Sequence, residues 1–142
     1  MYVILGGKPE REIVITEWAL DAYLQLVAVQ AFTREEYKTV IRPDVMLLQD
    51  FPKGAKFRDA RFWSHAPDPF YGVISQGYRM KWHSVGDGKR QLRLPVGMLD
   101  NALLFEAYIK RGPKQERRML ARFKTHLQLA CMGRYVKRGV LP

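Results

Sequence analysis

The hydrophobic positions at the start of the chain follow first a strand pattern and then a helical one. The stretch REIVIT (11–16) is rich in β-branched residues and predicts a short strand. Thr16 can then cap a helix that begins near Trp18. Apolar residues recur at helical spacing through WALDAYLQLVAVQAF (18–32), which predicts an amphipathic helix of about four turns.

A second helix is predicted over TREEYKTVIRPDVMLLQDF (33–51). Thr33 and Glu36 have the spacing of a capping box, in which each side chain bonds the backbone N–H of the other residue. Pro43 breaks or kinks this helix, because proline has no backbone N–H. The two helices form an N-terminal helical hairpin. The pattern then weakens over residues 52–69, which predicts a loop.

Alternating patterns follow and predict an antiparallel sheet arranged as a meander. The strands are expected at PFYGVIS (69–75), which runs into GYRMKWHS (77–84), at RQLRLPV (90–96) and at ALLFEAYIK (102–110). VGDGK (85–89) is a tight turn with Asp-Gly at its centre. Pro95 cannot donate a ladder hydrogen bond, so its strand is expected to fray there or to lie at a sheet edge.

The segment RGPKQERRMLARFKTHLQLACMGRYVKRG (111–139) predicts a basic C-terminal helix, with Pro113 in its first turn. Its inner stripe is apolar and its remaining surface is cationic. The inner residues are Leu120, Phe123, Leu127 and Ala130, and Arg118, Arg122 and Lys124 fall largely outside the stripe. The predicted fold is α+β: an N-terminal helical hairpin packed on a central antiparallel β-sheet, with a basic C-terminal helix. No linker divides it, so residues 1–142 are expected to form one domain.

Two chemistries separate across the strand GYRMKWH (77–83), because alternate side chains point to opposite faces of a sheet. The side chains expected to enter the core are Tyr78, Met80 and Trp82. The side chains expected on the open face are Arg79, Lys81, His83 and, from the next strand, Arg93. The last strand places Glu106, Tyr108 and Lys110 together on one side. An open face with these groups suits phosphate binding combined with proton transfer.

The net charge of +10 is concentrated at the end of the chain. Residues 1–109 hold 14 Lys and Arg against 13 Asp and Glu, whereas residues 110–142 hold 10 Lys and Arg against Glu116 alone. Such a local field suits a phosphate backbone, an anionic membrane surface or an acidic protein, and a solubilising basic tail is the plain alternative. No stretch approaches the roughly 20 apolar residues of a membrane span, and the single Cys131 fits a reducing compartment. A cytoplasmic protein without a membrane partner is expected.

Cleavage of RNA without a metal needs a base for the 2′-hydroxyl, cations for the pentavalent phosphorane and an acid for the leaving 5′-oxygen. The candidate catalytic residues are Arg79, Lys81, His83, Glu106 and Tyr108. The candidate RNA-binding residues are Arg93, Lys110, Arg111, Lys114, Arg118 and Arg122. The three histidines lack metal-ligand spacing and one cysteine cannot build a zinc set, so neither a metal nor another cofactor is expected.

Two segments resemble a known family. SQGYRMKW (75–82) is similar to the strand in which RelE/ParE-superfamily toxins of bacterial toxin–antitoxin systems carry Gly-Tyr-Arg, and AYIKRGPKQERRMLARFKTHL (107–127) is similar to a segment of the HigB-like branch. The resemblance covers roughly residues 11–130. It assigns Arg79 to the phosphate-contacting arginine and matches Lys110 and Arg111 to the paired basic residues.

The resemblance implies a toxin that cleaves mRNA on the ribosome without a metal and is silenced by a cognate antitoxin protein. Two alternatives stay open. The strand before Gly77 lacks the lysines that ribonucleolytic members carry, which favours a ParE-like inhibitor of DNA gyrase. The second alternative is a non-catalytic nucleic-acid-binding protein on the same scaffold.

Overall fold

A six-stranded sheet with helices on both faces forms the part of the chain that the computed structural model describes, residues 11–139 and 141. The strands are β1 (Ile13–Ile15), β2 (Trp63–Pro67), β3 (Val73–Val85), β4 (Arg90–Met98), β5 (Ala102–Leu104) and β6 (Tyr108–Ile109). They lie in the order β1-β5-β4-β3-β2, and β6 also pairs with β4. The helices are α1 (Glu17–Ala28), α2 (Arg34–Glu36), α3 (Arg42–Met46) and α4 (Pro113–Cys131). The mixed α+β class and the C-terminal helix are therefore as predicted.

The helices start where the capping residues predict. The Thr16 hydroxyl accepts a hydrogen bond from the Ala19 amide at the start of α1 and donates one to the Leu104 carbonyl, at 2.7 Å. Thr33 and Glu36 form the capping box of α2. Both predicted N-terminal caps are thus confirmed.

Pro43 does not break the second helix. A π-helical turn, Tyr37–Ile41, links α2 to α3 and places Pro43 in the first turn of α3. The Arg42 amide donates to the Tyr37 carbonyl five residues earlier, so the wider turn accommodates the proline ring. Short 3₁₀ turns follow at Leu47–Asp50 and Ala55–Arg58.

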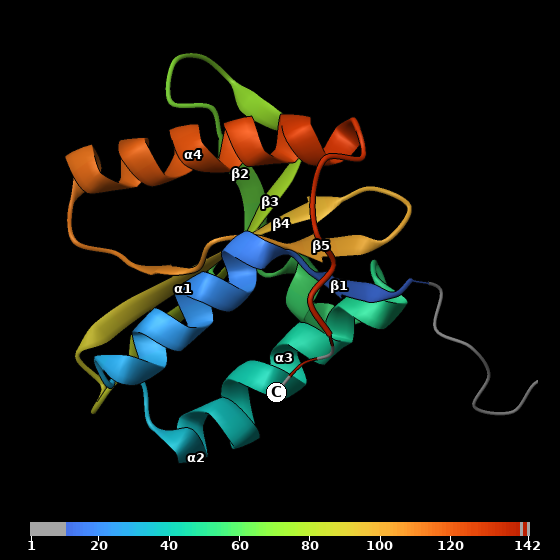
Figure 1. Cartoon of the computed structure of the whole chain (residues 1–142). Helices are drawn as coiled ribbons and strands as arrows, with labels where there is room; N and C mark the ends of the chain where they lie inside the picture. Colours follow the sequence, from blue (N-terminus) through green and yellow to red (C-terminus); the bar gives the residue numbers. More distant parts are fainter. Residues whose placement is uncertain (1–10, 140, 142) are drawn as a thin grey trace, which may run out of the picture.

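The two faces of the sheet carry separate apolar cores. The α1 and α2–α3 side packs against even-numbered residues of the long strands, including Met80, Trp82, Leu92, Leu94 and Val96. The other face packs against α4 through Leu120, Phe123, Leu127 and Ala130, the stripe that the sequence predicts. Figure 1 shows α4 on the opposite side of the molecule from α2 and α3, and the start of α1 lies against α4, where Trp18 stacks on His126. Among the described residues, no helix has the length and apolar content to cross a bilayer.

Three expectations about the sheet are wrong. β1 joins the sheet parallel to β5, so the sheet is not purely antiparallel. β2 lies inside the segment predicted to be a loop, and its buried Trp63 and Ala66 anchor it against β3. The predicted last strand is interrupted between β5 and β6 at residues 105–107.

Pro95 lies in a central strand and not at an edge. It pairs with Arg79 of β3 on one side, and its carbonyl accepts the Phe105 amide on the other. In an antiparallel ladder the N–H and C=O of a residue point the same way, so the missing N–H of Pro95 faces the interruption between β5 and β6. No ladder bond is lost there.

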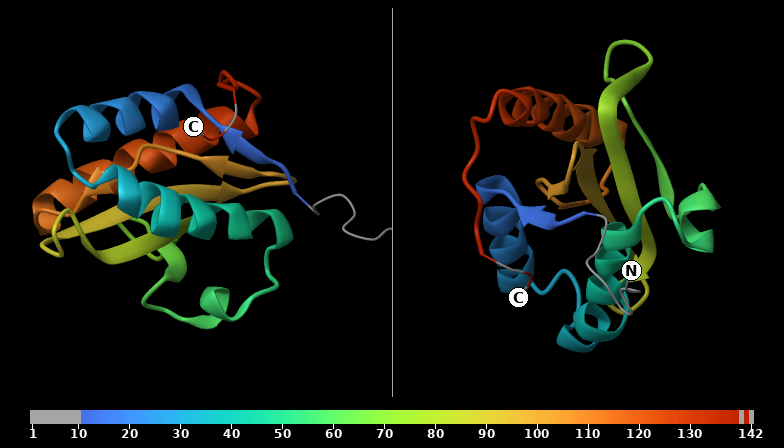
Figure 2. Two further views of the ribbon diagram at one scale, coloured as in Figure 1. Left: turned by 90° about the horizontal axis from the view of Figure 1, so that it is seen from below. Right: turned by 90° about the vertical axis from the view of Figure 1, so that its right-hand side faces the viewer.

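The segment between β2 and β3, residues 68–72, extends beyond α4. It is visible above that helix in Figure 1 and again in the right-hand view of Figure 2. The long strands β3 and β4 run from this end of the molecule to the turn at residues 86–89.

Candidate functional site

Three cations lie together on the α4 face of the sheet. Arg79 and Lys81 are on β3, and Arg93 lies directly opposite Lys81 on β4. Like charges directly opposite on paired strands repel each other, so this arrangement lowers the stability of the free protein. Burial, followed by the neighbouring charges of Arg79 and Arg93, lowers the pKa of Lys81. The cluster of Arg79, Lys81 and Arg93 is called the cation cluster below.

Glu116 is the carboxylate in contact with the cation cluster. Its Oε2 atom accepts a hydrogen bond from Nη1 of Arg79 at 2.8 Å and another from the hydroxyl of Tyr108 at 2.9 Å. Nζ of Lys110 lies 3.7 Å from Oε1. The side chains of Arg79 and Glu116 are only 16% and 15% exposed, so their interaction is weakly screened by water.

Two glycines allow α4 to bring Glu116 to this position. Gly77 and Gly97 are paired across β3 and β4 beneath α4. A Cβ atom on Gly97 would lie 2.6 Å from a methyl carbon of Leu127, and one on Gly77 would lie 3.0 Å from the ring of Phe123. Larger residues would push α4 away from the sheet.

Glu116 lies in the first turn of α4, where the helix dipole favours an acidic residue.

Positive charge exceeds negative charge in the cluster. Among the described residues, the one ion pair of the three cations is that of Arg79 with Glu116, and the charges of Asp59 and Glu116 act on Lys81 without an ion-pair contact. The Nε atom of Arg79 is buried and has no hydrogen-bond partner in the described part of the chain. A second anion with several acceptor oxygens could therefore neutralise the excess positive charge and accept a hydrogen bond from Nε of Arg79.

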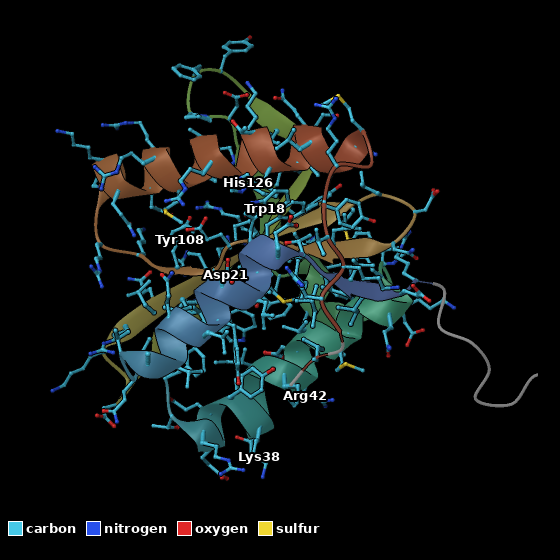
Figure 3. The ribbon with its side chains drawn as sticks, viewed as in Figure 1. Trp18, Asp21, Lys38, Arg42, Tyr108 and His126 are labelled. Atoms are coloured by element: carbon cyan, nitrogen blue, oxygen red, sulfur yellow. The ribbon has the colours of Figure 1, made fainter. Side chains whose placement is uncertain are left out.

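Arg93 and Tyr108 are not on an open face, as the sequence analysis expected. Each is only 4% exposed. Arg93 donates to the carbonyls of Trp82 and Leu92 and to the side chain of Gln91. Burial is the main cause that raises the pKa of Tyr108 to about 12. Strand alternation predicts which face of the sheet these side chains occupy, but not that neighbouring segments bury them there. Figure 3 shows Tyr108 in the region below α4.

Lys81 and His83 bind backbone carbonyls of the loop before β2. Nζ of Lys81 donates to the Ala60 carbonyl, and Nε2 of His83 lies 2.6 Å from the Arg61 carbonyl. A carbonyl can only accept, so Nε2 of His83 carries the proton. The β3–β4 pairing also shifts register between Trp82 and Val85. His83 lies beside Lys81 against residues 60 and 61, and it makes no hydrogen bond with Arg79, Arg93 or Glu116 in the described part of the chain.

Glu106 lies outside the cluster. Its carboxylate is 3.3 Å from Arg122 of α4, and its pKa is raised by burial and by Asp21 of α1. Residues 105–107 interrupt the predicted strand between Glu106 and Tyr108. Glu106 and Tyr108 line one pocket beside α4, but no hydrogen bond joins them in the described part of the chain.

The other candidate RNA-binding residues are exposed. They are Lys110, Arg111, Lys114, Arg118 and Arg122. Lys110 is the one that reaches the site, through Glu116. Arg111 precedes α4, Lys114 lies in its first turn, and Arg118 and Arg122 lie further along it, so these four extend the positive surface away from the cluster.

Sequence reasoning missed Glu116 as a site residue. It noted Glu116 only as the single acid in a basic segment. The useful signal was position: an acid three residues after Pro113 lies in the first helical turn, at the end of α4 that faces the cation cluster.

No family model, curated protein or solved structure matches this chain in comparisons with known proteins. Within the described residues, no three His, Cys, Asp or Glu side chains are grouped so that they could hold a metal ion. The resemblance to RelE/ParE toxins and the expectation of metal-independent chemistry therefore stay predictions.

Proposed function

We propose that this protein is a metal-independent endoribonuclease of the RelE/ParE type, a toxin with mRNA on the ribosome as its substrate and an antitoxin as its partner. The observation that carries the proposal is the partly buried cation cluster, in which Arg79 alone forms an ion pair with a carboxylate in the described part of the chain. A phosphodiester supplies the missing negative charge together with acceptor oxygens.

Substrate binding is an exchange of anions at Arg79. In the free protein Glu116 neutralises part of the guanidinium charge. An entering phosphate takes this role, with further charge from Lys81 and from the buried Arg93. Because these charges are held in place by the fold, they stabilise the phosphorane electrostatically without reorganisation during the reaction.

The reaction needs two proton transfers. Glu116, released from Arg79, accepts the proton of the 2′-hydroxyl, and the 2′-oxygen attacks phosphorus. Lys81, whose pKa is lowered, gives a proton to the departing 5′-oxygen. The products are a 2′,3′-cyclic phosphate and a 5′-hydroxyl. Tyr108 acts as a positioning residue, because its hydroxyl holds the Glu116 carboxylate. His83 and Glu106 receive no role in this scheme.

The test is cleavage of ribosome-bound mRNA by purified protein, with analysis of the new RNA ends. A cyclic phosphate and a 5′-hydroxyl are expected, and a 2′-deoxy nucleotide at the cleavage site should block the reaction. Arg79→Ala should lower the rate by roughly 100-fold or more, as loss of a donor to a developing charge does elsewhere. The matched control is Arg34→Ala, since Arg34 is an exposed arginine in α2.

Products with a 5′-phosphate, or full activity of the Arg79 variant, would refute the nuclease proposal. A growth arrest that a small co-expressed acidic protein relieves would support the toxin assignment. Growth unaffected by expression of active protein would count against it.

A second candidate function is nucleic-acid binding without catalysis. It is favoured because the groups that would transfer protons are already bonded to other side chains. Glu116 accepts hydrogen bonds from Arg79 and Tyr108, and burial raises the pKa of Tyr108 to about 12. Salt-sensitive binding of RNA without any cleavage on the ribosome would identify this function.

A further inference from the structure

Two adjacent aromatic side chains stand in solvent at the end of the β2–β3 loop. Phe70 is 86% exposed and Tyr71 is 91% exposed, the highest values for large hydrophobic residues in the described part of the chain. Burying such rings normally stabilises a fold, so these two contribute nothing to it. The loop of residues 68–72 is called the aromatic tip below.

The aromatic tip is fixed to α4 through Asp68. One carboxylate oxygen of Asp68 accepts the Phe70 amide at 2.9 Å, and the other lies 2.6 Å from Nζ of Lys124. The Asp68 amide donates to the Gly72 carbonyl and closes the loop. Gly72 has φ +68°, a conformation that favours glycine. The two rings are therefore held out by a tied loop and not by a free tail.

The same flank of α4 leads from the aromatic tip to the cation cluster. Arg117 follows Glu116 directly and lies seven residues before Lys124, so Arg117 and Lys124 share one side of the helix. The helix rises about 12 Å between Glu116 and Lys124. Arg117 is exposed and has no ion pair among the described residues. Positive charge thus runs between the two places.

We propose that Phe70 and Tyr71 form a stacking site for bases of single-stranded RNA that flank the phosphate held at Arg79. This inference rests on the proposed function and names how its substrate is gripped. Exposed aromatic faces beside a cationic track are the combination that single-stranded nucleic acids recognise, because every base has a face to stack and every linkage has a charge.

The test uses a 2′-O-methyl oligoadenylate, which cannot be cleaved through its 2′-oxygen, with 2-aminopurine at successive positions. Phe70→Ala and Tyr71→Ala should each weaken binding by roughly 5- to 150-fold, the range for loss of one stacked base. Stacking should quench 2-aminopurine at one or two positions in the wild-type complex, and the alanine variants should restore its fluorescence. Tyr71→Phe keeps the ring and should bind as the wild type does.

Salt dependence separates stacking from charge. The slope of log K against log salt should be unchanged in the two alanine variants, whereas Arg117→Ala should lower it by about 0.7. Leu24→Ala is the matched control, because Leu24 is 54% exposed on α1, away from the aromatic tip. It should bind normally.

The two proposals fail differently. Suppose that the wild type binds the oligonucleotide and Arg79→Ala weakens this binding, whereas Phe70→Ala and Tyr71→Ala bind unchanged and 2-aminopurine stays quenched. The aromatic tip is then not a stacking site, and contact with a protein is the other use of its exposed rings. If the wild type does not bind the oligonucleotide at all, the stacking site is overturned together with the RNA-binding step of the proposed function.

Discussion

Replacing Glu116 with glutamine tests the charge imbalance of the cation cluster. The variant Glu116→Gln keeps the shape of the side chain and one acceptor oxygen, but it removes the carboxylate that touches Arg79. We expect a less stable protein that binds anions more strongly. We also expect it to lose RNA cleavage, because glutamine cannot accept the proton of the 2′-hydroxyl.

The magnitude follows from burial. A hydrogen bond to a charged group contributes about 1.5–3 kcal/mol, and breaking a fully buried ion pair costs about 3–5 kcal/mol. The pair here is about five-sixths buried, and glutamine retains part of the bonding, so the free energy of unfolding should fall by about 2 kcal/mol. For a chain of 142 residues this corresponds to a decrease in Tm of about 7 °C.

The assay is thermal unfolding with and without phosphate at constant ionic strength. Phosphate at about 100 times its Kd adds about 2.7 kcal/mol to a protein that binds it only when folded. The variant should recover most of its lost stability, whereas the wild type should gain less because Glu116 competes for Arg79. The control is Glu106→Gln, whose partner Arg122 is 59% exposed, so its effect should stay below about 1 kcal/mol without phosphate rescue.

An unchanged Tm in Glu116→Gln, or equal phosphate stabilisation of the variant and the wild type, would contradict the reasoning. Either result would mean that the cluster is already neutralised by water and counterions and does not seek an anion.

Three further predictions concern the support of the site. The ring of His126 stacks on that of Trp18, with the ring centroids 4.1 Å apart (Figure 3), and burial lowers its pKa below the ordinary value of 6.5. The unfolded chain therefore binds more protons in acid than the folded protein, so the free energy of unfolding should be full above pH 6.5 and fall below it. In urea unfolding, His126→Phe should show a smaller fall in stability between pH 8 and pH 5 than the wild type. Gly97→Ala should reduce stability by about 1–3 kcal/mol in urea unfolding through overpacking against α4; wild-type stability would show that α4 can shift freely. Asp44→Ala should lower the free energy of unfolding by about 1–3 kcal/mol, because it leaves the buried indole N–H of Trp82 without the acceptor that lies 2.9 Å away. Asp44→Asn keeps an acceptor oxygen and should lower it less. Equal losses of stability in calorimetry would mean that the charge of Asp44 matters and not the hydrogen bond.

Much of the local structure could be predicted because its causes are local. The caps at Thr16 and Thr33 depend on residues three positions away, and the apolar stripe of α4 repeats with the helical period. The alternation along β3 places Arg79 and Lys81 on the face opposite Met80 for the same reason. Each signal is contained in a short segment.

The errors arose where distant segments meet. β1 pairs with β5 in parallel although almost 90 residues separate their register partners, and no local pattern encodes that contact. The same holds for Pro95, whose missing N–H is harmless only because the neighbouring strand is interrupted beside it. An edge position was the sound local inference, and the partner strand made it wrong.

The amino-acid sequence by itself determined which side chains share a face and where the positive charge accumulates, because strand and helix periods act over a few residues. Only the tertiary structure decided that Glu116 sits against Arg79, that Arg93 and Tyr108 are covered, and that Glu106 and His83 contact other groups. The physical reason is that burial and ion pairing depend on the approach of α4 and β6 to the sheet, and two glycines far from Glu116 in the chain set that approach.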